Sequence, residues 1–183
     1  QGVTLKKYLD SAYRKARHDL ATAFVERCAA FVEQGGTVAV VTPQNWRYLS
    51  SYKAFRQALL QRHTCQVLAP LGPGAFRRVS GEVVNVLLLL ATRIEPRPGD
   101  VITVVDAEGA ATASEKDARL RTVATRTVDQ ASQAMNSDSR VTLQAPPETS
   151  LLNRYATGLA GVCTGDYPRF GRYFWELPEV ADG

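Results

Sequence analysis

Two apolar runs separated by a glycine-rich loop occupy the middle of the chain: CQVLAPLGPGAFRRVSGEVVNVLLLLA, residues 65–91. The runs CQVLAPL (65–71) and VVNVLLLLA (83–91) each have the length and composition of a buried β-strand. The loop between them, of about ten residues, is too short for a typical helical crossover between parallel strands. We therefore expect the second strand to return antiparallel to the first.

The sequence before these runs predicts a strand followed by a helix. TVAVVT (37–42) is apolar at nearly every position, which is typical of a strand buried on both faces of a helix-covered sheet. Tyr52, Phe55 and Leu59 have helical spacing and lead into CQVLAPL, which completes a strand–helix–strand unit. An earlier helix is expected from a set of apolar residues that recur on one face: Leu20, Phe24, Cys28, Phe31 and Val32.

The second part of the chain has a different character. VITVVDA (101–107) suggests one more strand, and residues 114–135, which lack glycine and proline, predict a helix. A short final helix is expected over residues 151–159. The predicted fold class is thus α/β over residues 1–107, followed by a mainly helical segment over residues 108–183.

Composition permits many functions and excludes a few. The 183 residues are 45% hydrophobic and 22% charged, with a net charge of +4 and a pI near 9.1, so a polyanionic partner is allowed but not required. The longest apolar run, residues 83–91, is far shorter than the roughly 20 residues of a membrane span. No signal peptide is visible, and three distant cysteines (Cys28, Cys65, Cys163) indicate reduced thiols, so we expect a cytoplasmic protein. The chain starts at Gln1, which suggests a processed chain or a piece of something longer.

Common catalytic and ligand-binding motifs are absent from the sequence. There is no glycine-rich dinucleotide loop at a strand-to-helix turn, no P-loop and no nucleophile elbow. His18 and His63 lack neighbours at metal-ligand spacing, so we expect solvated surface roles for both and no metal site. Asp106 and Glu108 lie in a predicted loop, where solvation is the simplest role.

Taken together, DLATAFVERCAAFVEQGGTVAVVTPQNWRYLSSYKAFRQALL (19–60) and LAPLGPGAFRRVSGEVVNVLLLL (68–90) resemble the latter part of the catalytic domain of S-adenosylmethionine-dependent DNA adenine-N6 methyltransferases. The pattern is most similar to fused type IIG restriction–modification enzymes and to the methyltransferase of BREX phage-defence systems. TGDYPRFGRYFWEL (164–177) also resembles a block found where that catalytic domain passes into the target-recognition region. The resemblance implies a Rossmann-like fold whose last three strands are present, with the final, antiparallel strand inserted between the other two.

Two motifs of that family are missing from this sequence. Neither the glycine-rich loop that binds S-adenosylmethionine nor the Asn-Pro-Pro-aromatic motif that holds the target amine occurs, so no catalytic residue is expected here. The resemblance therefore implies the second half of a catalytic domain, starting after the Asn-Pro-Pro-aromatic motif. We expect the isolated chain neither to bind the cofactor tightly nor to methylate DNA.

The resemblance also gives a role to the glycine-rich loop. Phe76 occupies the position of a phenylalanine that lies against the flipped target adenine, and Arg77 and Arg78 are candidates for contacts with flanking phosphates. The residues alone favour a different role for Phe76, as a satellite core residue that caps the edge of the sheet. Gly72 and Gly74 would let the backbone approach its neighbours closely.

Four further residues are candidate contacts. Phe24 matches an aromatic that borders the adenine of the cofactor, although its helical spacing fits core packing as well. Asn45 follows a strand at its carboxyl end and is a candidate DNA contact, with a simple turn beside a buried Trp46 as the alternative. Arg169 and Arg172 in the tail are candidates for DNA contact or for domain packing.

Three functions remain open at this stage: part of a DNA adenine methyltransferase acting on double-stranded DNA, a non-catalytic DNA- or protein-binding module derived from that fold, and an α/β fragment without a nucleic-acid role. In the first case strand 37–42 would lie at an edge, because its neighbour in the fold is the absent fourth strand. Such an apolar edge should pair with the missing N-terminal half, self-associate, or be covered by the tail or by a first short helix, which is expected from the spacing of Leu5, Leu9, Ala12 and Ala16. Fast amide exchange over Val38–Val41 is expected in a monomer.

Overall fold

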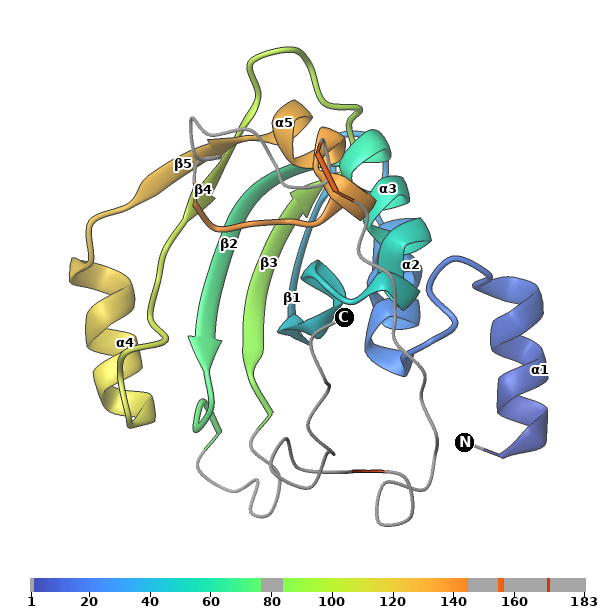
Figure 1. Cartoon of the computed structure of the whole chain (residues 1–183), viewed down its shortest axis with the longest axis horizontal. Helices are drawn as coiled ribbons and strands as arrows, with labels where there is room; N and C mark the ends of the chain where they lie inside the picture. The colour runs from blue at the N-terminus through green and yellow to red at the C-terminus, as the bar shows by residue number, and fades with distance from the viewer. Residues whose placement is uncertain (1, 77–83, 145–154, 157–170, 172–183) are drawn as a thin grey trace, which may run out of the picture. The chain divides into compact units, whose positions relative to one another are not determined.

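The computed structural model describes residues 2–76, 84–144, 155–156 and 171. Residues 1–146 form one compact unit, and residues 147–183 form a second unit of which three residues are described. The helices and strands of the first unit follow one another in this order (Figure 1): α1 (Val3–Ala12), α2 (Leu20–Phe31), β1 (Thr37–Pro43), η1 (Gln44–Arg47), η2 (Ser50–Tyr52), α3 (Lys53–Arg62), β2 (Thr64–Gly72), β3 (Val86–Thr92), β4 (Val101–Val104), α4 (Ala113–Thr122), β5 (Arg126–Asp129), α5 (Gln130–Met135) and η3 (Ser137–Ser139).

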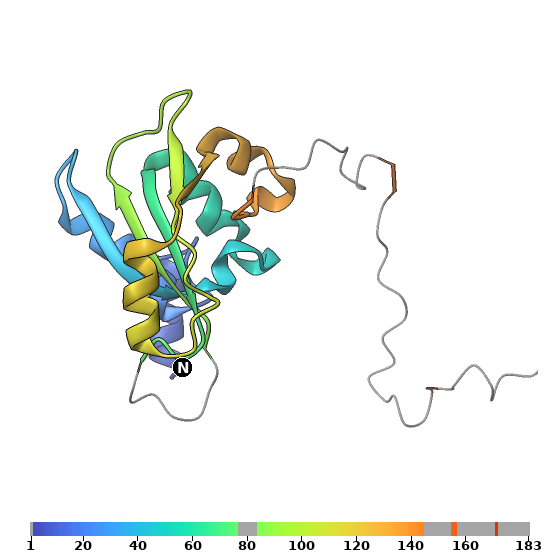
Figure 2. The ribbon, with the colours of Figure 1, turned by 90° about the vertical axis from the view of Figure 1, so that its left-hand side faces the viewer.

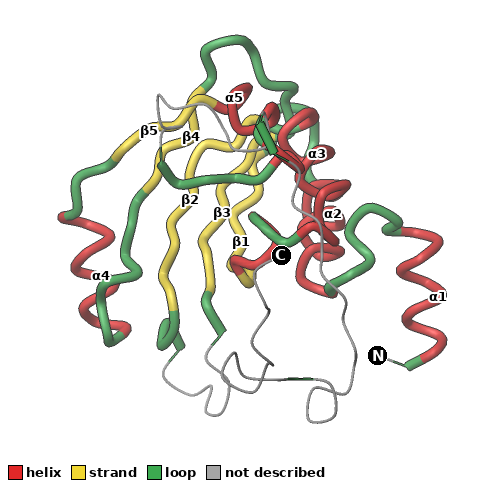
Figure 3. Tube along the Cα trace, in the orientation of Figure 1, coloured by secondary structure: helices red, strands yellow, loops and turns green. Residues whose placement is uncertain are grey.

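The described strands form one mixed sheet in the order β1-β3-β2-β4-β5 (Figure 3). Strand β3 lies between β1 and β2 and is antiparallel to both, with Val40 opposite Leu89 and Leu68 opposite Leu89. The expected antiparallel return is therefore confirmed. So is the expected insertion of the third strand between the first two, and β1 and β2 consequently run in the same direction.

The sheet continues further than the sequence pattern indicated. Strand β4 is the expected strand of VITVVDA and pairs parallel to β2, through Val67–Thr103 and Leu68–Val104. The single helix expected over residues 114–135 is wrong, because strand β5 interrupts it and pairs antiparallel to β4. Propensity alone missed β5 because its four residues are too few for a recognisable period, and its pairing with β4 is a tertiary contact. The two helices on either side of β5 still make this segment largely helical.

One face of the sheet is covered by helices. The side view in Figure 2 shows α3 and α5 on the same side of the sheet, and buried residues of α2 join the same core. Side chains on this face come from every strand, and the fully buried ones include Leu87 and Leu89 of β3, Leu68 of β2 and Ile102 of β4. Burial of this continuous apolar surface is the main stabilising contribution to the fold.

The opposite face is largely uncovered around β1, β3 and β2. Ala39 and Val41 of β1 are exposed, and Val41 keeps 46% of its surface accessible. A groove of about 460 Å³ follows this face and is bordered on one side by Leu120 of α4. The expectation that strand 37–42 is buried on both faces is therefore wrong for the described residues, because only its Val38 and Thr42 side chains are buried in the core.

Strand β1 is also the edge of the sheet, as expected, since within the described residues it pairs with β3 alone. The N–H of Arg93 donates to the carbonyl of Gly36 at 2.9 Å, and the N–H of Gln44 donates to that of Asn85 at 2.9 Å. Antiparallel pairing alternates along a strand, so the backbone groups of Val38 and Val40 also face β3. The backbone groups of Thr37, Ala39 and Val41 point away from the sheet.

Helix α2 buries a different face from the one expected. Its buried residues are Thr22, Ala23 and Val25, whereas Phe24 is 58% exposed and Phe31 is 70% exposed. The apolar stripe of this helix therefore faces away from the core that the described residues form. Core packing of Phe24, one of the two alternatives read from the sequence, does not occur in the described part of the chain.

Two simpler expectations concern the cysteines and the membrane. Cys28 and Cys65 are free thiols, and burial raises the pKa of Cys65 to about 12, while Cys163 lies outside the described residues. None of the helices in the described ranges is long and apolar enough to cross a membrane.

Candidate functional site

Three connecting segments meet at the carboxyl end of the sheet, which is the lower end in Figure 1. They follow the three strands that share one direction: η1 follows β1, a glycine-rich loop follows β2, and residues 105–112 follow β4. In open α/β sheets the carboxyl ends of parallel strands are where ligands bind. This end is therefore the first place to look for functional side chains.

The glycine-rich loop adopts backbone angles that favour glycine. Gly72 has a φ of +66° and Gly74 a φ of +73°, both in the left-handed region. A Cβ atom on Gly74 would lie 3.1 Å from the carbonyl oxygen of Ala111, and one on Gly72 would lie 3.4 Å from backbone atoms of Glu108. These two glycines therefore let the loop pack closely on the segment that follows β4.

Phe76 lies at the end of this described loop and is 52% exposed. It does not belong to either of the two core clusters, although Ala75 beside it packs against the smaller one. An exposed aromatic ring is available for contact with a planar ligand. Arg77 and Arg78, the expected phosphate contacts, lie outside the described residues.

Lys116 anchors the base of the glycine-rich loop. Its side chain is buried, with 3% of the residue exposed, and its Nζ donates to the carbonyls of Leu71 and Ala110. Lys116 lies in the first turn of α4, which begins with a capping box between Thr112 and Glu115. The ammonium group thus ties the end of β2 to the start of α4, and it was missed because its acceptors are backbone carbonyls distant in sequence.

The turn after β1 is built around Trp46. The indole is 1% exposed, donates from Nε1 to Thr42 Oγ1 at 2.9 Å, and meets the ring of Phe55 edge-on at a centroid distance of 5.5 Å. Trp46 is therefore the expected buried tryptophan. Asn45 is half-buried, and its backbone carbonyl accepts from Tyr48 and Leu49, which closes a turn. Nothing in this geometry tests a contact between Asn45 and DNA.

Arg56 of α3 fixes the position of this turn and has no exposed surface. Its Nη1 donates to the carbonyls of Trp46 and Leu49, both at 2.6 Å. Its Nη2 donates to the carbonyl of Asp138 at 2.8 Å, and its Nε donates to that of Ser139 at 3.1 Å. Burial lowers the pKa of Arg56, and the nearby Asp138 carboxylate opposes that shift. One buried guanidinium thereby joins α3, the turn after β1 and η3.

Sequence analysis missed Arg56, although one signal for it exists. Tyr52, Phe55 and Leu59 form the apolar stripe of α3, and Arg56 lies within that stripe and not opposite it. A cation on the buried face of a helix must be satisfied by hydrogen bonds, because burying it alone is costly.

Arg47 is a second buried arginine at this end of the sheet. It is 7% exposed, donates from Nη2 to Gln44 Oε1 at 3.2 Å, and has no hydrogen-bond partner for Nε in the described part of the chain. Burial lowers the pKa of Arg47, and the carboxylates of Glu108 and Asp106 oppose that shift. Asp106 also accepts from Arg126 Nη2 at 3.0 Å, so it is an ion-pair partner and not merely solvated as expected.

The structure therefore brings Phe76 and Asn45 to the same end of the sheet. Phe24 lies on α2 with its ring exposed, whereas Arg169 and Arg172 lie outside the described residues. The residues described contain no group of three or more metal-ligating side chains.

Comparison with known proteins gives this arrangement a family context. Residues 1–74 match the family model described as Eco57I restriction-modification methylase. This matched segment contains α1 to α3, β1 and β2. The resemblance to adenine methyltransferases noted from the sequence is thereby confirmed for the first part of the chain.

Two curated relatives support the same assignment. The adenine-specific methyltransferase BrxX of Escherichia coli O9:H4 (strain HS) is 36% identical over 81 residues, which is 44% of this chain. The adenine-specific methyltransferase PglX of Lacticaseibacillus casei (strain Zhang) is 35% identical over 82 residues, which is 45% of this chain. The matched part covers 7% of the length of each relative.

The fold has a counterpart among solved structures. The type I restriction-modification system methyltransferase subunit from Streptococcus thermophilus superposes with a TM-score of 0.54 at 14% identity, over 75% of this chain and 33% of that one. At this identity the likeness shows the fold alone. It confirms the expected fold class, a partial Rossmann-like methyltransferase fold with its antiparallel strand.

Proposed function

We propose that this chain is part of a DNA adenine-N6 methyltransferase of a restriction–modification or phage-defence system, and that it forms the target-base side of the active site. The observation that carries the proposal is the position of β3, antiparallel between β1 and β2, directly after a segment that matches a methyltransferase family. Neither a helical nor a strand periodicity in the sequence predicts that strand order by itself.

The chemistry explains why the target side needs a defined geometry. The exocyclic amine of adenine is a poor nucleophile, because its lone pair is delocalised into the ring. S-adenosylmethionine supplies the activated methyl group, so the protein must hold the amine close to it and correctly oriented, which can contribute several kcal/mol. Of the described residues, the exposed ring of Phe24 fits the border of a cofactor site. The glycine-rich cofactor loop and the Asn-Pro-Pro-aromatic motif are not in this sequence.

We assign the missing elements to an N-terminal half of the catalytic domain that docks on β1. Three features on that side have no partner among the described residues: the outer edge of β1, the face around Ala39 and Val41, and the exposed Phe24 on α2. A neighbouring strand with helices on both faces would cover all three. Self-association through residues 37–42 is the competing arrangement.

We further propose that Phe76 stacks on the flipped adenine. Removing a base from the duplex costs a few kcal/mol, and an aromatic face returns about 1–3 kcal/mol per stacked base. Arg77, Arg78, Asn45, Arg169 and Arg172 are the proposed contacts to double-stranded DNA. Residues 108–183 would then form a helical linker and the start of the target-recognition region, and the enzyme would act in the cytoplasm.

Complementation is the decisive experiment. The chain is combined with an N-terminal methyltransferase half that contains the cofactor loop and the Asn-Pro-Pro-aromatic motif, and cofactor binding and DNA methylation are measured. We expect neither half to bind the cofactor tightly alone and the mixture to do both. Micromolar cofactor binding by the 183-residue chain alone would contradict the proposal that the cofactor site requires the N-terminal half. Salt-dependent DNA binding with no gain of methylation in the mixture would instead favour a non-catalytic binding module.

Replacing Phe76 tests the stacking proposal in the reconstituted enzyme. Phe76→Ala should lower single-turnover methylation by about five- to 150-fold, the equivalent of losing a stack of about 1–3 kcal/mol. Phe76→Trp should keep most activity, because any aromatic face can stack. Phe31→Ala is the control, since Phe31 at the C-terminal end of α2 is an even more exposed phenylalanine.

Thermal melting separates stacking from packing. The melting temperature of Phe76→Ala should hardly change if the ring is a base platform. If Phe76 instead closes the edge of the core, both replacements should lower the melting temperature, and the folded Ala variant should keep its turnover.

A further inference from the structure

A second cavity lies at the opposite end of the strands from Asn45 and Phe76. It has a volume of about 780 Å³, within the range of small-molecule sites. Its position follows from the elements that border it: Gln34 precedes β1, His63 precedes β2, and Arg93 follows the antiparallel β3. No role was expected for this end of the sheet from the sequence.

The floor of the cavity is apolar. It is lined by Val25 and Ala29 of α2 and by Phe55 and Leu59 of α3, and three of these, Val25, Phe55 and Leu59, belong to the main hydrophobic core. A floor of this kind favours a ligand with a planar, apolar part, because burying that part removes it from water.

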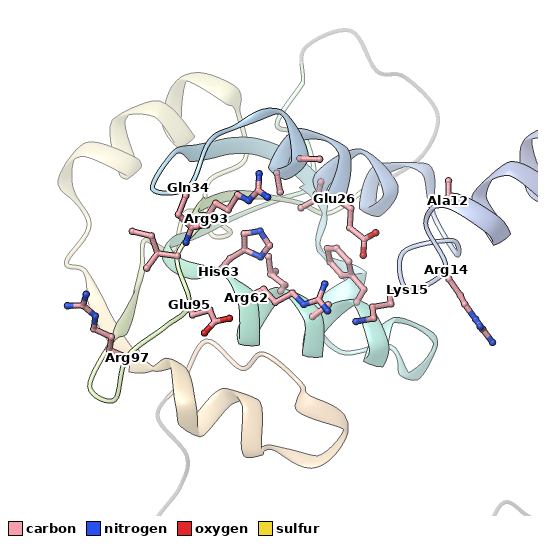
Figure 4. Close-up of a pocket in the computed structure, with 17 residues that line it drawn as sticks. Ala12, Arg14, Lys15, Glu26, Gln34, Arg62, His63, Arg93, Glu95 and Arg97 are labelled. Atoms are coloured by element: carbon pink, nitrogen blue, oxygen red, sulfur yellow. The ribbon is translucent and has the colours of Figure 1, made fainter.

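The rim of the cavity is strongly cationic. Five basic side chains line it, namely Arg14, Lys15, Arg62, Arg93 and Arg97, against the two carboxylates of Glu26 and Glu95. Figure 4 shows Lys15, Arg62 and Arg93 around the centre, with Arg14 and Arg97 at the outer margins.

None of these five cations forms an ion pair within residues 2–76 and 84–144, in contrast to Arg17, Lys53 and Arg126, which each pair with an aspartate at 2.9–3.2 Å. Arg93 uses one donor, from Nη1 to the carbonyl of Val32 at 2.7 Å, and keeps further N–H groups for a ligand. Unpaired cations gathered around a concave surface create a positive potential that attracts anions.

His63 lies at the centre of the cavity in Figure 4. The sequence suggested a solvated surface histidine, which is wrong, because the residue is half-buried and its Nδ1 is buried without a hydrogen-bond partner in the described residues. Burial and the positive charges of Arg93 and Arg62 lower the pKa of His63, which favours the neutral imidazole. Burial also raises the pKa of Glu26, against the opposing effects of Lys15 and Arg62.

We propose that this cavity binds a small phosphate-bearing molecule of the nucleotide class, with its ring on the α2–α3 floor and its phosphates on Lys15, Arg62 and Arg93. Guanidinium groups suit phosphate because their paired N–H groups match its oxygens. The apolar floor favours a ligand that contains a ring. The excess of cations over carboxylates favours a ligand with more than one negative charge. This site does not depend on the proposed methyltransferase function.

Binding is measured on the full 183-residue chain alone, by calorimetry at low salt. ADP is the main probe, with adenosine as its uncharged counterpart and pyrophosphate as the isolated charged part. We expect ADP to bind at least about tenfold more tightly than adenosine, since each charge-assisted hydrogen bond is worth that much or more. Absence of ADP binding at millimolar concentrations would overturn the proposal.

Three variants locate the site. Arg62→Gln should weaken ADP binding about tenfold or more, whereas Arg121→Gln, an exposed arginine of α4 outside the cavity, should leave it within about twofold. Ala29→Phe should abolish binding by filling the floor without changing any charge. Equal effects of Arg62→Gln and Arg121→Gln would mean general charge attraction and would overturn the site.

Two further measurements keep the test decisive. If Arg62→Gln lowers the melting temperature, Arg93→Gln replaces it as the test variant.

The imidazole signals of His63 should shift on ADP addition, because phosphate near Arg62 and Arg93 raises the pKa of His63 toward its ordinary value. Short duplex DNA that binds through Arg62 while ADP does not bind would also overturn the nucleotide assignment. These binding measurements do not require the N-terminal half of the catalytic domain. Their outcome is therefore independent of the outcome of the methylation experiments.

Discussion

The two faces of the sheet are built from the same kinds of residue but have different surroundings. On β3, Leu87 and Leu89 are buried beneath α2 and α3, whereas Leu88 and Leu90 point into the groove on the opposite face. The alternation of a strand places neighbours on opposite faces, so four consecutive leucines supply two apolar surfaces. Within the described residues, this chain covers one of them with its own helices and leaves most of the other uncovered apart from α4.

The comparison shows what an uninterrupted apolar strand indicates about the two faces of its sheet. TVAVVT and VLLLLAT carry apolar side chains on both faces, and a monomer rarely exposes a large contiguous apolar surface without a binding partner. The sequence of β1 and β3 therefore fits a larger assembly than the described unit. The exposed apolar side chains of α2 also fit a larger assembly, in which another part would cover this layer of helices.

The largest expected effect is a difference between two neighbouring leucines. Leu89→Ala, on the covered face, should destabilise the chain by about 2–5 kcal/mol, because it removes a fully buried side chain and leaves a cavity. Leu90→Ala, on the open face, should cost about 1 kcal/mol or less, since that side chain is only half-buried. Urea unfolding of both variants gives the difference.

The same two variants also test whether an N-terminal half covers the open face. When an N-terminal half docks on the open face, the cost of Leu90→Ala should rise toward that of Leu89→Ala. Equal costs for the two variants in the isolated chain would show that the open face is already covered.

Removal of Arg56 should be the next largest effect. Arg56→Met keeps the length of the side chain but leaves the carbonyls of Trp46, Leu49 and Asp138 without a donor, at a cost of about 2–4 kcal/mol. Arg121→Met is the control, because its ion pair with Asp117 is exposed, and its cost should stay below about 0.5 kcal/mol. Similar values for the two variants, by thermal or urea unfolding, would contradict the structural role of Arg56.

A charge on the open edge should change association more than stability. Val41→Lys places an ammonium group at the exposed edge of β1, where charged side chains discourage strand pairing. We expect the variant to be monomeric at concentrations where the parent chain associates, with a change in unfolding free energy below about 1 kcal/mol. Sedimentation velocity measures the first quantity and urea unfolding the second. Unchanged association would place the contact elsewhere than on β1.

The smallest expected effect is an alternation in amide exchange along β1. In a monomer the amides of Ala39 and Val41 should exchange faster than those of Val38 and Val40, because only the latter two face β3. This pattern refines the uniform fast exchange expected from the sequence over Val38–Val41. Protection of all four amides, detected by NMR in a demonstrated monomer, would mean that another segment pairs with this edge.

Local pattern was sufficient where the deciding interactions are short-range. The strands at residues 37–42, 65–71 and 83–91, the helix between the first two, and the close approach of Gly72 and Gly74 all follow from apolar runs and glycine positions, and the antiparallel return follows from the length of the loop. The methyltransferase resemblance came from the combination of these blocks and not from any one of them.

Tertiary contact decided the features that local pattern does not encode. The apolar stripe of α2 could not reveal which face the core would use, because periodicity does not specify the neighbours of a face, and Phe24 is exposed among the described residues. Strand β5 depends on pairing with β4, and the buried Arg56 depends on carbonyls that approach it from residues 46 to 139. The sequence by itself thus determined the strands β1 to β4 and their class of fold, because periodicity and turn length act locally. Which faces are covered, where the buried cations lie and which unpaired cations gather around His63 were decided by the tertiary structure, because burial and charge depend on neighbours distant along the chain.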